Sequence, residues 1–118
     1  MLKTSLPAAA LLLATATLAT AAEAPKAFNL CKACHKVEPG KNAVGPSLFG
    51  VVGRKAGTEP GYKCSPAMEK AGWDWTPDKL AEYLADPKKM VPGNKMTFAG
   101  LKKPEQVKEV VEYLETLK

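Results

Sequence analysis

The sequence predicts a small all-α domain in which long loops join the helices. Three segments begin with a residue followed by proline, and proline favours the first position of a helix because that position needs no N–H donor. These starts are Ser65-Pro66, Thr76-Pro77 and Lys103-Pro104. No segment alternates apolar and polar residues as a half-buried strand would. Glycine and proline instead mark loops at residues 38–46, 55–63 and 90–96.

The predicted helices differ in length and in the strength of their apolar faces. The first of the three is short and is closed by Gly72. The second ends at Asp86, because the residue before a proline avoids helical geometry. A further short helix over residues 26–36 is expected to carry two cysteines. The apolar faces are Leu80, Tyr83 and Leu84 in the second helix, and Val107, Val110, Val111, Leu114 and Leu117 in the last.

The first 21 residues are predicted to be a cleavable secretory signal peptide. Lys3 gives a positive start, and the stretch from Leu6 to Ala16 is rich in leucine and alanine. Residues 19–21 then fit the small-x-small pattern of a cleavage site. The alternative is a membrane anchor, but the apolar run over residues 6–22 has 17 residues and includes a proline. A spanning helix needs about 20 mostly apolar residues. Export to the periplasm is therefore expected.

Cleavage would leave one domain over residues 22–118. A domain of about 97 residues buries a modest core and often depends on a metal or cofactor. Its 16 basic and 12 acidic residues give a net charge of +4 at neutral pH. These charges are too few and too interspersed to indicate nucleic-acid binding, but they suit docking on acidic protein surfaces.

The stretch Cys-Lys-Ala-Cys-His at residues 31–35 is the most specific chemical motif. A zinc site needs four ligands, usually as two close pairs, and only Cys64 remains outside the motif. A redox dithiol normally follows a strand in a βαβ unit, which this sequence does not predict. A covalent haem uses every residue, because Cys31 and Cys34 can each form a thioether with a vinyl group while His35 reaches the iron.

A low-spin haem also needs a second axial ligand. The chain contains a single histidine, so the candidates are Met68, Met90 and Met96. Met68 falls in a predicted helix and Met90 follows one, which suits simple packing. Met96 lies in the loop after the turn at Pro92-Gly93, where no regular helix would bury its side chain. The spacing alone favours Met96 over Met90 without excluding the latter.

Three segments together resemble class I c-type cytochromes, in the branch of cytochrome c2 and the mitochondrial-type proteins. The segments are CKACH, GPSLFGVVGRKAG and WDWTPDKLAEYLADPKKMVPGNKMTFAGLKK, and the resemblance runs from about Phe28 to the C-terminus. The most specific motif is Pro-Gly-x-Lys-Met-x-Phe-Ala-Gly at residues 92–100. The resemblance implies a cytochrome c fold, with helices and long loops wrapped around one covalent haem c. It also implies that His35 and Met96 are the two iron ligands.

The resemblance implies roles for four further residues. Pro46 corresponds to a proline whose carbonyl accepts a hydrogen bond from the ligand histidine, which fixes the tautomer of the ring. Arg54 and Trp75 correspond to donors that hydrogen-bond a buried haem propionate. Tyr83 corresponds to a tyrosine near the methionine sulfur. From the sequence alone, Arg54 would equally fit a solvated surface, and Trp75 and Tyr83 an ordinary core.

Two positions depart from the family pattern. Cys64 stands where the mitochondrial proteins carry a tyrosine bonded to a propionate, and Asn94 stands in place of a threonine with a similar role. An amide keeps donor capacity, whereas a thiol donates weakly. We therefore expect altered hydrogen bonding of the propionate, and we expect Cys64 to be a buried, small apolar residue.

The resemblance further implies a periplasmic one-electron carrier rather than an enzyme. Its partners would be membrane or periplasmic redox proteins: a bc1-type complex or a dehydrogenase as donor, and an oxidase or a reaction centre as acceptor. A monomer is expected, since lasting association would block exchange of partners. Two alternatives stay open, a small haem peroxidase in which Met96 leaves the iron and a subunit held by one enzyme. The docking face would be the lysines around the exposed haem edge, Lys36, Lys88, Lys89, Lys95, Lys102 and Lys103.

Overall fold

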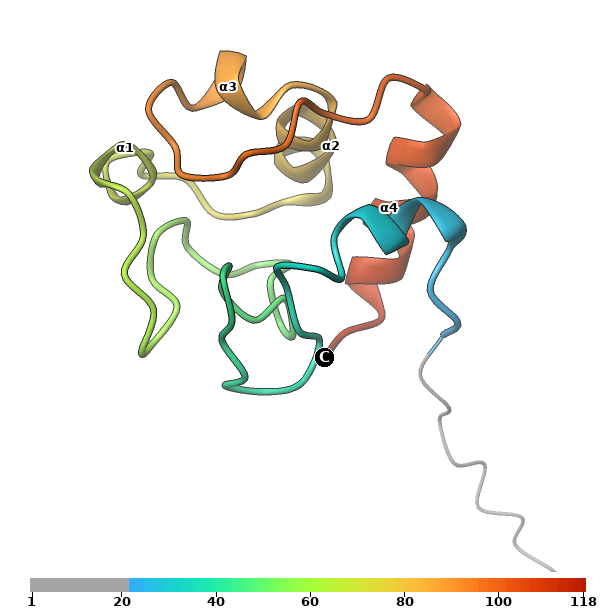
Figure 1. Cartoon of the computed structure of the whole chain (residues 1–118), viewed down its shortest axis with the longest axis horizontal. Coiled ribbons are helices and arrows are strands. Elements are labelled where there is room, and N and C mark those ends of the chain that lie inside the picture. The colour runs from blue at the N-terminus through green and yellow to red at the C-terminus, as the bar shows by residue number, and fades with distance from the viewer. Residues whose placement is uncertain (1–21) are drawn as a thin grey trace, which may run out of the picture.

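The computed structural model describes residues 22–118, in which short helices alternate with long loops (Figure 1). The signal peptide expected in the first 21 residues lies outside the described residues. Within residues 22–118 no strand forms, and an isolated bridge joins Lys55 to Asp74. The all-α prediction is therefore confirmed. The elements are the 3-10 helix η1 (Lys26–Leu30) and the α-helices α1 (Pro66–Glu69), α2 (Pro77–Ala85), α3 (Pro87–Met90) and α4 (Pro104–Glu115).

The three predicted helix starts are confirmed, and two of them are capped by side chains. The hydroxyls of Ser65 and Thr76 each accept a hydrogen bond from the N–H three residues further on, at 3.1 and 3.2 Å. Such a cap satisfies an N–H that the first turn of a helix leaves unpaired, and it stabilises the helix by about 1 kcal/mol. The third start has Pro104 in the first position, but Lys103 provides no side-chain cap.

Helix α3 was not predicted, because one residue both ends α2 and begins α3. The N–H of Asp86 donates to the carbonyl of Glu82 in α2, while its carboxylate accepts a hydrogen bond from the N–H of Lys89 at 3.2 Å. The sequence interpretation treated Pro87 only as the end of the second helix. It also stands at the first position of α3, as proline does in the other three α-helices.

Two predicted helices are shorter in the structure. The helix expected over residues 26–36 ends as η1 at Leu30, and a turn follows in which the N–H of His35 donates to the carbonyl of Cys31 at 3.0 Å. The helix cannot continue beyond this turn, since the carbonyl of Cys34 accepts its hydrogen bond from the distant N–H of Gly45 at 2.7 Å. Helix α1 ends at Glu69, before the predicted closing glycine.

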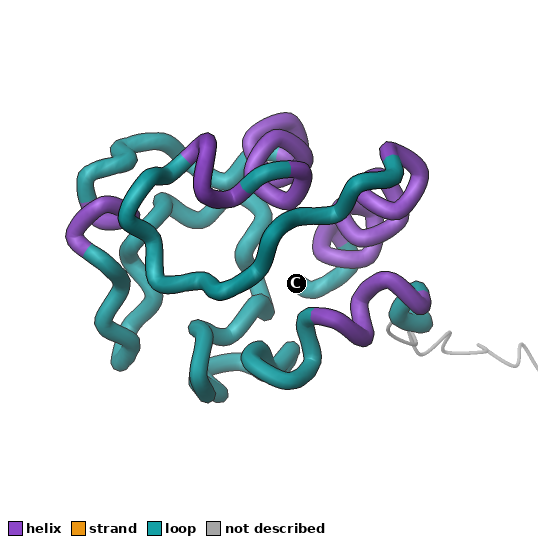
Figure 2. The backbone as a smooth tube through the Cα atoms, turned by 45° about the horizontal axis from the view of Figure 1, so that its top comes forward, coloured by secondary structure: helices purple, strands orange, loops and turns teal. Residues whose placement is uncertain are grey.

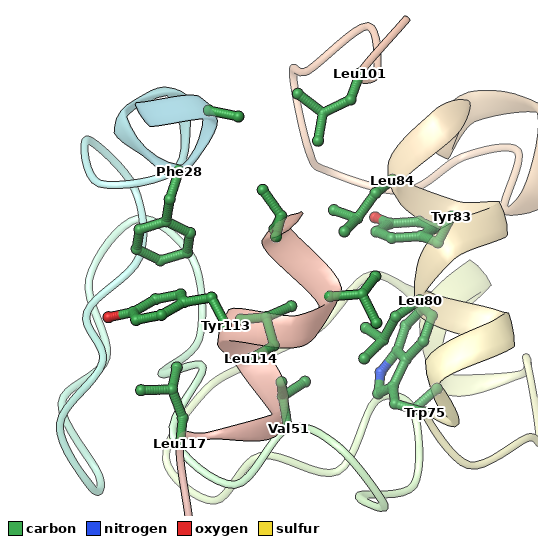
Figure 3. Close-up of a cluster of buried hydrophobic side chains, with 14 of the residues drawn as sticks. Phe28, Val51, Trp75, Leu80, Tyr83, Leu84, Leu101, Tyr113, Leu114 and Leu117 are labelled. Carbon is green, nitrogen blue, oxygen red and sulfur yellow. The ribbon is translucent and has the colours of Figure 1, made fainter. Parts of the chain in front are cut away.

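The apolar core joins η1, α2 and α4. Phe28 of η1 packs edge-on against Tyr113 of α4, with 4.8 Å between the ring centroids (Figure 3). Both predicted apolar faces are buried, except that Val107 is only partly covered, and Tyr113 joins the core although it was not predicted to. Figure 2 shows how much of the remaining backbone is loop, including the long segment from α3 to α4. None of the helices in this described part is long and apolar enough to cross a membrane.

Candidate haem site

A cavity of about 420 Å³ is lined by residues of the helices and of the loops that join them. This volume lies within the range of roughly 300–1,000 Å³ that is typical of sites for small molecules and cofactors. Much of its wall is apolar, with contributions from Phe28, Val51 and Leu80. All the residues that the sequence analysis assigned to the site line this one cavity: Cys31, Cys34, His35, Pro46, Arg54, Trp75, Tyr83 and Met96.

The two cysteines of the motif lie on one tight turn at the cavity. The N–H groups of Cys34 and His35 both donate to the carbonyl of Cys31, at 3.2 and 3.0 Å. Both thiols are free and partly exposed. Burial raises the pKa of the Cys31 thiol, and the nearby thiol of Cys34 adds to the effect. The turn therefore presents two accessible thiols together with an imidazole, which is the donor set that covalent haem attachment requires.

His35 is held in one tautomer by a single hydrogen bond. Its Nδ1 lies 2.7 Å from the carbonyl oxygen of Pro46. Because a carbonyl only accepts, Nδ1 carries the proton and Nε2 keeps its lone pair. Burial lowers the pKa of His35, the hydrogen bond to Pro46 opposes this, and the charge of Arg54 lowers the pKa further. The ring is therefore neutral at pH 7, which is the form that binds a metal.

Gly45 is a site residue that the sequence analysis missed. A Cβ at this position would lie 2.7 Å from Nδ1 and 2.9 Å from Nε2 of His35, closer than side chains approach one another. The imidazole therefore lies directly against the backbone at residue 45, and only glycine leaves room for it. The sequence offered one sign of this contact, since Gly45 directly precedes Pro46 in the quoted segment.

Of the three candidate methionines, Met68 and Met96 line the cavity, whereas Met90 ends α3 outside its lining. The hydroxyl of Tyr83 lies 4.0 Å from the sulfur of Met96, at the long limit for a hydrogen bond to sulfur. Burial is the main cause that raises the pKa of Tyr83 to about 12. The hydroxyl therefore stays protonated at neutral pH and can donate toward the thioether.

Arg54 is tied into the wall of the cavity rather than solvated. Its guanidinium donates to the carboxylate of Glu59 at 2.6 Å and to the carbonyl of Ser47 at 3.0 Å. Backbone hydrogen bonds join its segment to that of Trp75, whose N–H donates to the carbonyl of Arg54 at 2.8 Å. The Trp75 ring is buried and packs against Tyr83, with 5.0 Å between the centroids. The pairing of Arg54 with Glu59 was not predicted.

The two departures from the family pattern also lie at the cavity. Cys64 is buried, with 8% of its surface exposed, and its thiol is free. Burial is the main cause that raises its pKa, so the thiol stays protonated at neutral pH. This fits the expectation of a small, unreactive residue. The N–H₂ group of Asn94 is not available to a group bound in the cavity, because it donates to the carbonyls of Pro87 and Val91, at 3.0 and 2.8 Å.

These features fit a haem. The cavity is of cofactor size and mainly apolar, while its polar groups are those that a haem would need: two thiols on one turn, a neutral imidazole, a thioether and an arginine. The glycine that accommodates His35 shows that the backbone is shaped around the orientation of this ring. The fold and the site together define a small all-α haem protein.

The comparisons with known proteins give the family. Residues 21–118 match the sequence model of the family described as Cytochrome c. The chain is 63% identical over 97 residues to a cytochrome c2 iso-2 of Magnetospirillum molischianum, across 82% of this chain and all of that protein. It is 58% identical to a cytochrome c2 of Rhodoplanes tepidamans, across 81% of this chain and 99% of that one.

Solved structures agree with this assignment. A cytochrome cH from Methylobacterium extorquens is similar with a TM-score of 0.73 and 52% identity, across 77% of this chain and 92% of that chain. A ferricytochrome c2 from Rhodopseudomonas palustris is similar with a TM-score of 0.71 and 43% identity, across 81% of this chain and all of that one. The chain belongs to the cytochrome c family and has its fold. It is an electron carrier with a covalent haem c rather than an enzyme, and it exchanges electrons with other redox proteins.

Proposed function

We propose that this protein is a periplasmic one-electron shuttle whose haem c is attached through Cys31 and Cys34 and ligated by His35 and Met96. The observation that carries the proposal is that these four side chains line one cavity. When bound, the haem iron accepts and releases one electron. The chain's own residues would hold the group through two thioether bonds, the Nε2 atom of the imidazole and the sulfur of the methionine.

Four neighbouring residues would orient the cofactor and its ligands. The hydrogen bond from His35 to Pro46 directs the remaining lone pair of the ring, at Nε2, to a metal. The hydroxyl of Tyr83 restrains the sulfur of Met96 from the side of α2. Arg54 and Trp75 line the cavity with a guanidinium and an indole N–H, which are the donors that a buried haem carboxylate would need.

This ligand set supports a carrier over a peroxidase. If His35 and Met96 both held the iron, they would leave no coordination position for peroxide or oxygen. The chain also contains a single histidine, so no second imidazole can serve as an acid–base group beside the iron. The same two ligands would serve both oxidation states, which keeps rearrangement during electron transfer small.

The surface supports docking on acidic partners. The six lysines predicted for the docking face are all exposed, and none of them forms an ion pair within residues 22–118. Leu30 and Val44 line the cavity and are 62% and 75% exposed, so an apolar contact area lies at the mouth of the site. Such a surface suits a monomer that docks briefly on a bc1-type complex or a dehydrogenase, and then on an oxidase or a reaction centre.

The location follows from the expected signal peptide. Cleavage after residue 21 would release residues 22–118 into the periplasm. The relative from Magnetospirillum molischianum is matched over its whole length by 97 residues of this chain, which supports a mature protein of that size. Mass spectrometry of the exported protein, with its haem attached, would give the cleavage site directly.

An optical spectrum of the purified protein tests the ligation and the carrier function together. We expect a low-spin spectrum in both oxidation states, a weak methionine-to-iron band in the ferric form, and no change when carbon monoxide is added to the ferrous form. Ready binding of carbon monoxide, or a high-spin ferric form at neutral pH, would contradict ligation by Met96 and would favour a haem enzyme.

A further inference from the structure

We propose that Asn94 is a positioning residue for the Met96 thioether. It holds the thioether in the cavity by fastening the loop that contains Met96 to α3. This inference rests on the proposal above that Met96 is an iron ligand. It assigns Asn94 a role through the protein backbone, in place of the hydrogen bond to a haem propionate that the resemblance implied.

The side chain of Asn94 makes three hydrogen bonds, all of them to the backbone. Its Oδ1 accepts from the N–H of Met96 at 2.8 Å. Its Nδ2 donates to the carbonyls of Pro87 and Val91, at 3.0 and 2.8 Å. These partners also fix which end of the amide is oxygen and which is nitrogen. The N–H of Met96 can only donate, so it faces Oδ1, and the two carbonyls can only accept, so they face Nδ2. Both amide hydrogens are thus used, and none is left for a cavity ligand.

The anchor at the other end of these bonds is buried backbone at the two ends of α3. Pro87 is fully buried, and Val91 is 3% exposed. The carbonyl of Val91 accepts from both the backbone N–H and the side chain of Asn94, at 3.1 and 2.8 Å. The carbonyl of Pro87 likewise accepts from the backbone N–H of Val91 at 2.9 Å, so the amide is a second donor to two carbonyls that the α3 turn already pairs. One side chain connects buried backbone at the two ends of α3 to the residue that carries the thioether.

The loop beyond Asn94 makes few other hydrogen bonds: Lys95 Nζ donates to the carbonyl of Lys63 at 3.1 Å, and the carbonyl of Ala99 accepts from Lys102 Nζ at 2.9 Å. Within the described chain, the backbone of residues 95–100 makes no backbone-to-backbone hydrogen bond. The 4.0 Å approach of the Tyr83 hydroxyl acts on the sulfur and leaves the backbone free. The bond to Asn94 therefore sets where the backbone of Met96 lies. A ligand that is fixed in place before it binds loses less entropy on binding, so the fastening favours the thioether over competing ligands.

Exogenous imidazole measures this preference, because it can bind the iron only where the thioether has left. The variants are Asn94→Ala, which removes all three bonds, and Asn94→Asp, which keeps the acceptor for Met96 but places a carboxylate oxygen against two carbonyls. The matched control is Asn42→Ala. Asn42 also joins two loops by its amide, accepting from Ser47 N–H at 2.9 Å and donating to the carbonyl of Pro60 at 3.0 Å, but it lies on the histidine side.

We expect the ferric holoprotein of both Asn94 variants to bind imidazole about tenfold more tightly than the natural protein, since one lost hydrogen bond changes an equilibrium by roughly that factor. Their methionine-to-iron band should weaken, and their reduction potential should fall as the thioether ligand is lost. Asn42→Ala should lower the midpoint of thermal unfolding while its imidazole affinity stays at the natural value.

Three results would overturn the inference. Natural imidazole affinity and an unchanged band in both Asn94 variants would show that the amide does not position the thioether. An equal gain of affinity in Asn42→Ala would assign the effect to general destabilisation. Absence of the band from the natural holoprotein would remove Met96 from the iron, and the proposed ligation and this inference would fail together. In the first two cases the proposed function would stand.

Discussion

The guanidinium of Arg54 and the carboxylate of Glu59 lie 2.6 Å apart in the wall of the cavity, and their side chains are only 16% and 10% exposed. Water therefore screens the two charges little. Arg54, which we propose to hydrogen-bond a haem carboxylate, is thus paired with a carboxylate of the chain itself. The net charge that the site presents to an iron depends on both residues.

Glu59→Gln should raise the reduction potential. Removing a negative charge beside the cavity disfavours Fe(III), which carries one more positive charge than Fe(II), and it leaves the charge of Arg54 unbalanced. We expect a rise on the order of tens of millivolts, where 59 mV corresponds to a tenfold change in a one-electron equilibrium. Redox potentiometry measures the shift. The control is Glu109→Gln, an exposed carboxylate of α4. An unchanged or lower potential in Glu59→Gln would contradict this role of the pair.

Gly45→Ala should displace the histidine ring. The added Cβ would lie 2.7 Å from Nδ1 of His35, so the ring or the backbone must move. Overpacking of this kind costs roughly 1–3 kcal/mol, and it should also change the low-spin spectrum and lower the yield of attached haem. Gly40→Ala is the control, because Gly40 has a φ of +69° and open space around it. It should cost roughly 1–2 kcal/mol of backbone strain and leave the spectrum unchanged.

Tyr83→Phe should make the protein less sensitive to alkaline pH. Because its pKa is raised from 10.0 to about 12, the folded protein keeps this proton when the unfolded chain has lost it. The associated stability is fully present below pH 10 and is lost between pH 10 and pH 12, at about 1.4 kcal/mol for each pH unit. Unfolding free energies of both proteins across this range give the difference. Parallel pH profiles would mean that the hydroxyl does not titrate as its burial requires.

Sequence reasoning succeeded where a local pattern determines the outcome. Proline in the first helical position predicts a start at Ser65 or Thr76 from neighbouring residues alone, and the apolar faces of α2 and α4 follow from helical spacing. The motif at residues 31–35 likewise contains its chemistry within five residues. The roles of the individual site residues stay predictions, although the structure brings them to one cavity.

It failed where the outcome depends on how irregular backbone folds back on itself. The contact of Gly45 with His35 and the ion pair of Arg54 with Glu59 arise from the path of the loops, and neither helical nor strand spacing predicts them. The sequence predicts only that Asp86 ends α2. Its second role, as the cap of α3, depends on the rotamer of its side chain. Asn94 was assigned by its position in a motif, whereas its amide is used by backbone groups of the preceding helix.

Reversing two charges of the proposed docking face should slow electron transfer without altering the site. Lys88 and Lys89 are exposed in the last turn of α3 and form no ion pair in the described residues. Lys88→Glu combined with Lys89→Glu should lower the second-order rate constant with an acidic redox partner about tenfold at low ionic strength, because charge steers encounter. The difference should largely vanish at 1 M salt, where the screening length falls to about 3 Å. Stopped-flow kinetics with a bc1-type complex measure the rate constant at low and at high salt. Lys118→Glu, which lies outside the six lysines, is the control. A loss in Lys118→Glu half as large on a logarithmic scale, in proportion to its smaller change of charge, would mean that net charge alone, and no defined face, sets the rate.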